Sequence, residues 1–324
     1  MSNPHNSNPA LDFEEWHRLY PPGVGFSGAE FLAMFSAGMD ALEENVQAIN
    51  SLNVFPVPDG DTGTNMFLTM RSVISEGTTV ASGTASEVAL SMARGGLLGA
   101  RGNSGVILSQ FFRGFADGIA GSAVVGPVEL YNGFCTAKNS AYQSVGTPKE
   151  GTMLTCMHSI SVDVSSMFPE VPPPQATTRE EVIALWGIAC RAASIALQRT
   201  PDLLPVLKQA GVVDAGAQGL CVILEGALRY LRNESNAIEV IGSENALNIA
   251  TTQVKEDFLS ETEEELYGYC TEITISGESL QVDQIRLDMS SMAASTVVVG
   301  DQNIVKVHVH VDDPGPILSY GATR

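Results

Sequence analysis

PVPDGDTGTN, residues 56–65, places two aspartates one residue apart in a loop of prolines and glycines, directly before a helical pattern. The chain of 324 residues already carries a formal net charge of −20. Repulsion between Asp59 and Asp61 therefore needs an offset, and a divalent cation is the obvious one. Mg²⁺ suits the pair because it takes few carboxylates and accepts waters and phosphate oxygens as its other ligands. The alternative is an ordinary turn with two solvated aspartates.

The loop does not follow the EF-hand pattern for calcium. That pattern needs Asp or Asn at position five, Gly at position six and Glu at position twelve. Counting from Asp59, these positions hold Gly63, Thr64 and Met70. Magnesium remains the better candidate, since Gly63 lets backbone approach a ligand closely and Asn53 could add a neutral oxygen.

Helical patterns surround the loop on both sides. In AEFLAMFSAGMDALEENVQAIN, residues 29–50, apolar residues recur at intervals of three to five. Comparable patterns continue to about residue 233, separated by Gly and Pro clusters. Before one of them, Thr177 or Thr178 offers an N-cap. We therefore expect roughly eight helices and no convincing strand up to residue 233.

The character of the chain changes after about residue 235. An acidic stretch, ETEEELYGY, precedes short β-branched runs at 270–275, 295–300 and 303–311. Alternation in the last run places four valines on one face of a strand, namely Val305, Val307, Val309 and Val311. These runs predict a small α/β domain.

The predicted fold class is thus α plus α/β. A length of 324 residues is compatible with about two domains. The patterns divide the chain into a flexible N-terminal tail (1–27), a helical domain (28–233), an acidic linker (234–265) and a small, incomplete α/β domain (266–324).

Composition excludes several classes of protein. Hydrophobic residues make up 44% of the chain and charged residues 17%, which is typical of packed globular domains. The acidic balance argues against a nucleic-acid partner and against binding to anionic membrane surfaces. We expect no transmembrane segment and no signal peptide, because no long apolar stretch and no basic leader occur. Five dispersed cysteines indicate reduced thiols and a cytoplasmic protein.

Three further loops rich in small residues precede helical patterns: GARGNSG (99–105), KEGTMLT (149–155) and GVVDAGAQGL (211–220). The first lacks the Gly-Lys-Ser/Thr ending of a P-loop and the Gly-x-Ser-x-Gly spacing of a hydrolase. Its backbone amides, with Asn103 and Ser104, could still cradle phosphate at a helix N-terminus. Each loop alone could be ordinary, but together with the aspartate pair they indicate a phosphate-binding site.

Taken in order, PVPDGDTGTNM, ARGNSGVILSQ, EGTMLT and AGVVDAGAQGL resemble the ATP-binding L domain of the dihydroxyacetone kinases. They resemble the bacterial fatty acid kinase A subunit more closely. The resemblance implies an all-helical barrel of about eight helices that binds ATP at one end through Mg²⁺ ions held by aspartates. One departure is the lack of a third aspartate shortly before the pair, where VFPVP is uncharged and Asn53 could substitute.

The resemblance assigns roles to residues of this chain. The candidate magnesium ligands are Asp59 and Asp61, which would also be catalytic residues. Independently of the resemblance, Arg101 is a candidate catalytic cation at the phosphates, and the alternative is a solvated arginine beside a helix start. The candidate phosphate contacts are Asn103, Ser104 and Gly105. The candidate neighbours of the nucleoside are Thr152, Met153, Asp214 and Gly216. The other candidate nucleotide-binding residues are Asn53, Thr62, Gly63, Thr64, Asn65 and Gly102.

A second constellation lies in the small domain. His308 and His310 are two residues apart on a predicted strand and so share a face. Cys270 begins another predicted strand, and one Cys with two His is a zinc-type ligand set. The alternative is that both histidines merely form the polar face of their strand. The middle domain of the fatty acid kinase A subunit resembles YGYCTE and KVHVHVDDPG, which implies that these three residues bind zinc.

The sequence therefore predicts a cytoplasmic, ATP- and Mg²⁺-dependent kinase subunit. The resemblance implies that it phosphorylates the carboxylate of a fatty acid presented by a separate fatty-acid-binding protein. It also implies C-terminal truncation, so that ATP binding should survive while acyl transfer is feeble. The alternatives are a nucleotide-binding regulatory protein without turnover and a dihydroxyacetone kinase-type subunit. A homodimer stays open.

Overall fold

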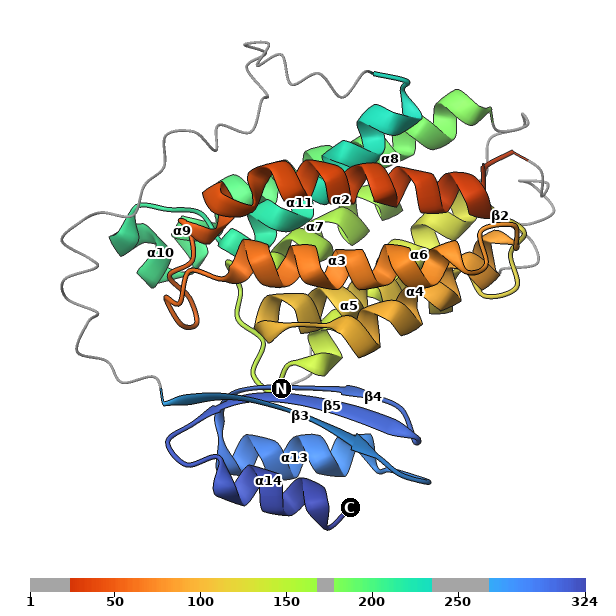
Figure 1. The fold of residues 1–324 in the computed structure, drawn as a ribbon. Coiled ribbons are helices and arrows are strands. Elements are labelled where there is room, and N and C mark those ends of the chain that lie inside the picture. The colour runs from red at the N-terminus through yellow and green to blue at the C-terminus, as the bar shows by residue number, and fades with distance from the viewer. Residues whose placement is uncertain (1–23, 168–177, 235–267) are drawn as a thin grey trace.

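The computed structural model describes residues 24–167, 178–234 and 268–324. Up to residue 234, its long helices form a closed ring in which each packs against the next and the last packs against the first (Figure 1). These helices are α2 (Gly28–Asn50), α3 (Thr62–Thr78), α4 (Ala85–Gly99), α5 (Gly102–Gly118), α6 (Pro127–Ser144), α7 (Met153–Ser166), α8 (Arg179–Gln198) and α11 (Ala215–Leu231). Two short helices, α9 (Thr200–Leu203) and α10 (Pro205–Ala210), connect α8 to α11. The predicted helical barrel is confirmed.

Capping residues set where several of these helices begin. Ser27 and Glu30 form a reciprocal capping box at the start of α2. Thr178 and Glu181 do the same for α8, so Thr178 is the predicted cap, whereas Thr177 lies outside the described residues. Within the ring, aromatic side chains from α2, α5 and α8 fill the core: Phe31, Phe35, Phe111, Phe115 and Trp186. Their edge-to-face packing joins helices far apart in sequence, as between Phe35 and Trp186.

Two sequence-based expectations need correction at the start of the barrel. Phe26 and Ser27, assigned to the flexible tail, form the short strand β1 (Phe26–Ser27), and Phe26 is completely buried. β1 pairs antiparallel with β2 (Val124–Val125), in a region where we expected no strand. The pairing lets Phe26 reach the barrel core, a contact that local periodicity does not reveal. Residues 1–23 of the predicted tail and nearly all of the predicted linker lie outside the described residues.

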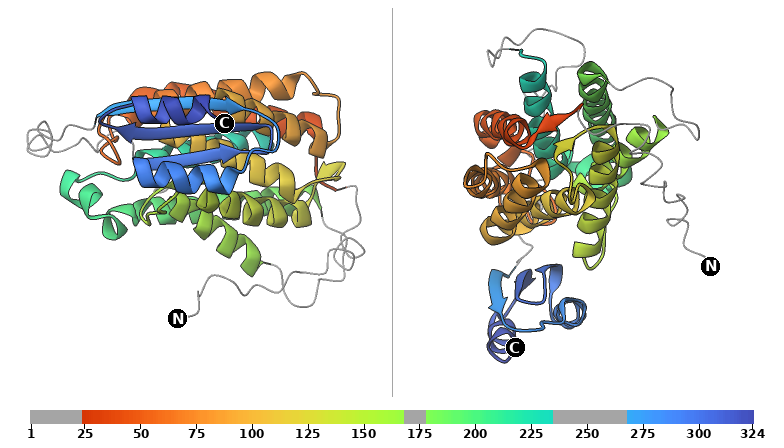
Figure 2. Two further views of the ribbon diagram at one scale, coloured as in Figure 1. Left: turned by 90° about the horizontal axis from the view of Figure 1, so that it is seen from below. Right: turned by 90° about the vertical axis from the view of Figure 1, so that its right-hand side faces the viewer.

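The C-terminal segment folds as β3 (Tyr269–Ser276), α13 (Val282–Met292), β4 (Ala294–Gly300), β5 (Ile304–Val311) and α14 (Gly315–Ala322). The three strands match the predicted β-branched runs, and β5 lies in the centre with antiparallel neighbours on both sides. Figures 1 and 2 show the sheet between the helical barrel and the pair α13 and α14. The small α/β domain is therefore confirmed.

One face of β5 buries apolar side chains, and the other buries polar ones. As predicted, the four valines at 305, 307, 309 and 311 share one face, and they pack in a core with Ile285 and Met289 of α13 and Ile317 of α14. The opposite face carries Lys306 and His308, which are also buried because it lies against the barrel.

Contacts between the barrel and the sheet are apolar and polar. Ala100 and Val106 of the barrel pack with Val297 and Val299 of β4. Arg113 Nη1 donates to the Gly300 carbonyl at 2.7 Å. These contacts place the sheet beside the loop that opens α5. In the part of the chain described, no helix combines the length and apolarity needed to span a membrane.

Candidate nucleotide and metal sites

Asn53 organises the loop that carries the two aspartates. Its side-chain amide donates to the Val57 carbonyl at 2.9 Å and to Asp59 Oδ1 at 2.6 Å, while its oxygen accepts a hydrogen bond from the Thr62 hydroxyl. Asn53 is buried, as is Thr62 at the start of α3. The residue predicted as a neutral cation ligand thus has its oxygen engaged within the loop, where it sets the position of Asp59.

The aspartate pair is electrostatically crowded. Desolvation, the charge of Asp61 and a hydrogen bond with that carboxyl group raise the pKa of Asp59 to about 6. No lysine or arginine pairs with either carboxylate among the ion pairs of the described residues. Two adjacent carboxylates lacking a cationic side chain form a hard-oxygen donor set that fits Mg²⁺.

The first turn of α3 is held against α2. Thr64 exchanges two hydrogen bonds with Asn50: its backbone amide donates to Asn50 Oδ1 at 3.2 Å and its hydroxyl accepts from Asn50 Nδ2 at 3.0 Å. Gly63 packs so closely on the Val46 carbonyl that no Cβ would fit. Thr62, Gly63 and Thr64 therefore anchor the loop, and their predicted contact with nucleotide stays a prediction.

The loop before α5 has an unusual backbone. Gly102 has φ +56°, and a Cβ at this position would collide with the side-chain amide of Asn65. The Arg101 amide donates to Thr69 Oγ1 at 3.2 Å, and that hydroxyl donates to the Asn65 carbonyl at 2.7 Å. Gly105 packs against the same threonine. Asn65, Gly102 and Gly105 thus shape the turn, while the exposed Arg101 occupies the N-cap position of α5.

Asp214 joins two helix starts. As the N-cap of α11, its Oδ2 accepts from the Ala217 amide at 2.8 Å and from the Met153 amide, at the start of α7, at 3.1 Å. Burial raises the pKa of Asp214 to about 6, although both backbone hydrogen bonds oppose the rise. Gly216 packs against the Met153 side chain. Asp214 therefore fixes the mutual position of α7 and α11 with one carboxylate oxygen.

A cavity of about 920 Å³ opens where the barrel meets the sheet. Six of the predicted nucleotide contacts line it: Asn103, Ser104, Thr152, Met153, Asp214 and Gly216. They come from the N-terminal ends of α5, α7 and α11, where helix dipoles favour anions, although Asp214 already accepts from the Met153 and Ala217 amides. Asn103 Oδ1 is buried there and has no hydrogen-bond partner among the described residues. A volume in this range suits a small-molecule ligand.

The sheet domain forms the opposite wall of this cavity, which the sequence did not predict. Ser290 and Met292 of α13, Thr296 of β4 and His310 of β5 line it, and so does Phe55 from the aspartate loop. Only the packing of the sheet on the barrel reveals these residues.

The cysteine and both histidines meet on the barrel-facing side of the sheet. Cys270 lies opposite His310 in the β3–β5 register, and Glu272 lies opposite His308. Cys270 Sγ is 3.9 Å from His308 Nε2, which is 3.3 Å from His310 Nε2. All three ligand atoms lie within 4.8 Å of one another. The three predicted zinc ligands are therefore brought together.

The spacing and chemistry of this cluster fit a tetrahedral cation. Bond lengths of about 2.0–2.3 Å place neighbouring ligand atoms about 3.3–3.6 Å apart. Burial, with the charges of His310 and Lys306, lowers the pKa of His308 to about 4, so the ring is neutral and able to bind metal. Partial burial and the charges of Asp59 and Asp61 raise the pKa of the Cys270 thiol. That influence means that the aspartate loop lies near the cluster.

Two charged residues beside the cluster, Glu272 and Lys306, were not predicted from the sequence. Lys306 Nζ pairs with Glu272 Oε1 at 3.0 Å, and Glu272 Oε2 lies 3.9 Å from His308 Nδ1. A signal was present, because Lys306 shares the parity of His308 and His310 on β5, as Glu272 shares that of Cys270 on β3.

Comparison with known proteins yields two matching families and several relatives. The DAK2 domain matches residues 56–229, and the FakA-like middle domain of the fatty acid kinase A subunits matches residues 266–324. Uncharacterized protein SAB1090 of Staphylococcus aureus (strain bovine RF122 / ET3-1) is 38% identical over 301 residues, or 91% of this chain and 53% of its own length. Uncharacterized protein SAUSA300_1119 of Staphylococcus aureus (strain USA300) shows the same identity and coverage.

The chain thus spans about half the length of these curated relatives. Its two matched regions follow one another as DAK2 domain and then middle domain, and they correspond to the barrel and the sheet described above. The chain belongs to the DAK2-domain family and has the domain architecture of the fatty acid kinase A subunits.

Proposed function

We propose that this kinase-type chain binds ATP with Mg²⁺ and transfers the γ-phosphate to a fatty acid carboxylate. The fatty acid would be presented by a separate fatty-acid-binding protein, as the family of the middle domain implies. The carboxylate oxygen would attack the γ-phosphorus as the bond to the bridging oxygen of ADP breaks, so that acyl phosphate and ADP leave.

The cavity at the end of the barrel is the observation that carries this proposal. Three helices begin in its wall, so the positive ends of three helix dipoles meet at the cavity, although Asp214 already accepts from one amide each of α7 and α11. The unpaired Asn103 Oδ1 is an acceptor for a ligand hydroxyl or amino group. In a chain with net charge −20, phosphate is more easily held by such amides and a cation than by lysines.

Asp59 and Asp61 would hold magnesium, which when bound neutralises charge on the phosphates during transfer. Asn53 fixes Asp59 by hydrogen bonding, so at least one carboxylate is already oriented before nucleotide arrives. Arg101, at the start of α5, would supply a further positive charge to the phosphates. Positioning and charge neutralisation are the main tasks of a protein in phosphoryl transfer.

We further propose that Cys270, His308 and His310 bind one Zn²⁺. Their ligand-atom distances and the neutral state of His308 support a tetrahedral cation. Its role would be structural, since it would join β3 to the central strand β5 on the face that meets the barrel.

Two other functions make different demands on the same cavity. A dihydroxyacetone kinase-type subunit would phosphorylate a three-carbon ketone, and a regulatory protein would bind nucleotide without turnover. The middle-domain match favours a fatty acid over a three-carbon ketone as the phosphorylated substrate. The crowded aspartate pair favours turnover over simple binding, because a metal-bridged phosphate is the reacting form.

One assay separates these functions. The chain is incubated with ATP, Mg²⁺ and either a fatty-acid-loaded carrier protein or dihydroxyacetone, and the products are identified by mass spectrometry. We expect acyl phosphate that requires Mg²⁺, and even slow turnover suffices because product identity decides. Phosphorylated dihydroxyacetone would favour the ketone reading. Calorimetric binding of nucleotide without either product would favour the regulatory reading.

A further inference from the structure

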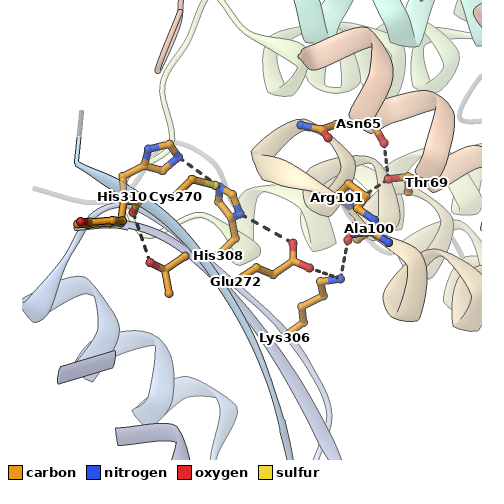
Figure 3. A network of polar contacts seen from close by, with 11 residues as sticks. Asn65, Thr69, Ala100, Arg101, Cys270, Glu272, Lys306, His308 and His310 are labelled. Carbon is orange, nitrogen blue, oxygen red and sulfur yellow. Dashed lines mark hydrogen bonds and ion pairs between the residues drawn. The ribbon is translucent and has the colours of Figure 1, made fainter. Parts of the chain in front are cut away.

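Lys306 is a buried ammonium group at the contact between the sheet and the barrel. Only 5% of the residue is exposed, yet its side chain reaches across to the barrel and donates to the Ala100 carbonyl. On its own sheet it pairs with Glu272 at 3.0 Å (Figure 3). Burying such a pair rarely stabilises a protein more than apolar packing would. A methionine could fill the same space, so stability alone does not explain a lysine here.

The carbonyl that Lys306 contacts belongs to the peptide group directly before the turn into α5. Ala100 and Arg101 share this peptide, whose amide side donates to Thr69 Oγ1 at 3.2 Å. Lys306 thus holds the peptide from the sheet, while Thr69 holds it from α3 (Figure 3). Directly afterwards, the left-handed Gly102 turns the chain into α5. The orientation of this peptide therefore sets the direction in which Asn103 and Ser104 enter the cavity.

Glu272, the acidic partner of Lys306, faces the cysteine–histidine cluster. Glu272 Oε2 lies 3.9 Å from His308 Nδ1, a buried nitrogen that has no hydrogen-bond partner in the part of the chain described. A histidine that binds a cation through one ring nitrogen carries its proton on the other and is oriented by an acceptor there. At 3.9 Å the contact is too long for a hydrogen bond here, but Glu272 carries the carboxylate that would become that acceptor, and it is at the same time the partner of Lys306.

We propose that Lys306 is a positioning residue that couples metal at the Cys270/His308/His310 cluster to nucleotide binding at the loop 100–105. The inference rests on the proposed nucleotide and zinc sites. Metal at the cluster orients His308, His308 engages Glu272, and Glu272 holds the Lys306 ammonium at the Ala100 carbonyl. Binding of zinc therefore strengthens binding of the magnesium–nucleotide complex, and binding of that complex strengthens binding of zinc. Linkage requires the two factors by which affinity rises to be equal.

The first arm of the test measures nucleotide affinity. A non-hydrolysable ATP analogue with Mg²⁺ is titrated calorimetrically into zinc-loaded wild type, Lys306→Met and Lys306→Arg. We expect Lys306→Met to weaken binding about tenfold, within the range of ordinary allosteric couplings, and Lys306→Arg to restore part of the loss. Lys208→Met, which removes an exposed lysine on α10, is the matched control and should bind as wild type. Circular dichroism and zinc content report whether each variant is folded.

The second arm needs no variant. Wild-type affinity for the analogue is measured with zinc and after its removal by a chelator, and zinc affinity is measured by chelator competition with and without the analogue. We expect the same factor, about tenfold, in both directions. In Lys306→Met that factor should approach one.

The outcomes separate the coupling from the proposed function. Unchanged affinity in folded Lys306→Met, or equal affinity of wild type with and without zinc, would overturn the coupling while leaving the nucleotide site in place. Absence of analogue binding by wild type would overturn the nucleotide site itself and the coupling with it. If Lys306→Met does not fold, the reciprocal measurement on wild type decides.

Discussion

The aspartate loop and the cysteine–histidine cluster are two donor sets built on opposite principles. In the loop, like charges are crowded, and the pKa of Asp59 rises to about 6. In the cluster, burial holds His308 neutral, and its pKa falls to about 4. A cation at the loop would relieve repulsion, whereas a cation at the cluster would meet His308, which is already desolvated and neutral, beside the exposed Cys270. The proposed magnesium site would thus be prepared by charge crowding, and the proposed zinc site by burial.

The backbones beneath the two sets also differ. The aspartates stand on an irregular loop that depends on Asn53 and on a left-handed Gly60 between them. The cluster stands on regular strands, where antiparallel register alone places Cys270 opposite His310. The loop should therefore be sensitive to local backbone changes, and the cluster to loss of a ligand.

The largest expected effect tests the loop. Asp61→Asn removes one of two carboxylates, so magnesium-bound nucleotide should bind at least about a thousandfold more weakly, equivalent to about 4 kcal/mol. Calorimetry gives the affinity, and circular dichroism should show an unchanged helical fold. Asp40→Asn removes the same charge from an exposed position of α2 and is the control. Equal affinity of both variants and wild type would exclude the loop as the magnesium site.

The next effect tests the cluster. Cys270→Ser removes the thiolate, and zinc affinity should fall several hundredfold, because structural zinc binding of about 10–16 kcal/mol is shared by only a few ligands. Elemental analysis should find about one zinc in wild type and almost none in the variant. Cys135→Ser changes a thiol on α6 of the barrel, which lies 3.8 Å from Ser165 Oγ and outside the cluster, and should keep the metal. A wild-type protein prepared without chelators that contains no zinc would refute the site.

A third test concerns Asp214, a buried carboxylate for which no cation is proposed, and the pH dependence of stability that it causes. The folded pKa of Asp214, about 6, exceeds its ordinary value of 3.8, so folded protein keeps a proton that unfolded chain has lost. Wild-type stability should therefore fall as pH rises from about 4 to about 6, by at most about 3 kcal/mol. Asp214→Asn keeps the oxygen that accepts both amide hydrogen bonds and should lack this part of the decrease. Denaturant unfolding at several pH values measures it, and parallel profiles would contradict it.

The smallest effect compares two glycines. Gly102→Ala and Gly121→Ala both place a side chain at positive φ, but only Gly102 has a neighbour in the way. We expect Gly102→Ala to lose about 1–2 kcal/mol more unfolding free energy than Gly121→Ala, with weaker nucleotide binding and unchanged zinc content. Loss of zinc in Gly102→Ala alone would show that the loop and the cluster are less independent than their backbones indicate, and would extend the coupling through Lys306.

Much of this architecture could be predicted because it depends on local pattern. Helical periodicity predicted α8, and Thr178 is one of the two caps predicted for its start. Period-two alternation predicted the apolar face of β5. The same alternation placed His308 and His310 on one face. The strand at Phe26 was not predicted, because it forms only by pairing with Val125, nearly a hundred residues later in the chain.

Residue types, spacing and family motifs by themselves determined the fold class, the aspartate pair and the three candidate zinc ligands. Tertiary structure alone decided what covers the polar face of β5, and hence that Lys306 reaches a carbonyl 206 residues away in sequence. It also decided that the cavity is shared by barrel and sheet. The physical reason is that periodicity specifies which side of an element is apolar, whereas the surface that buries the other side is chosen by packing between segments distant in the chain.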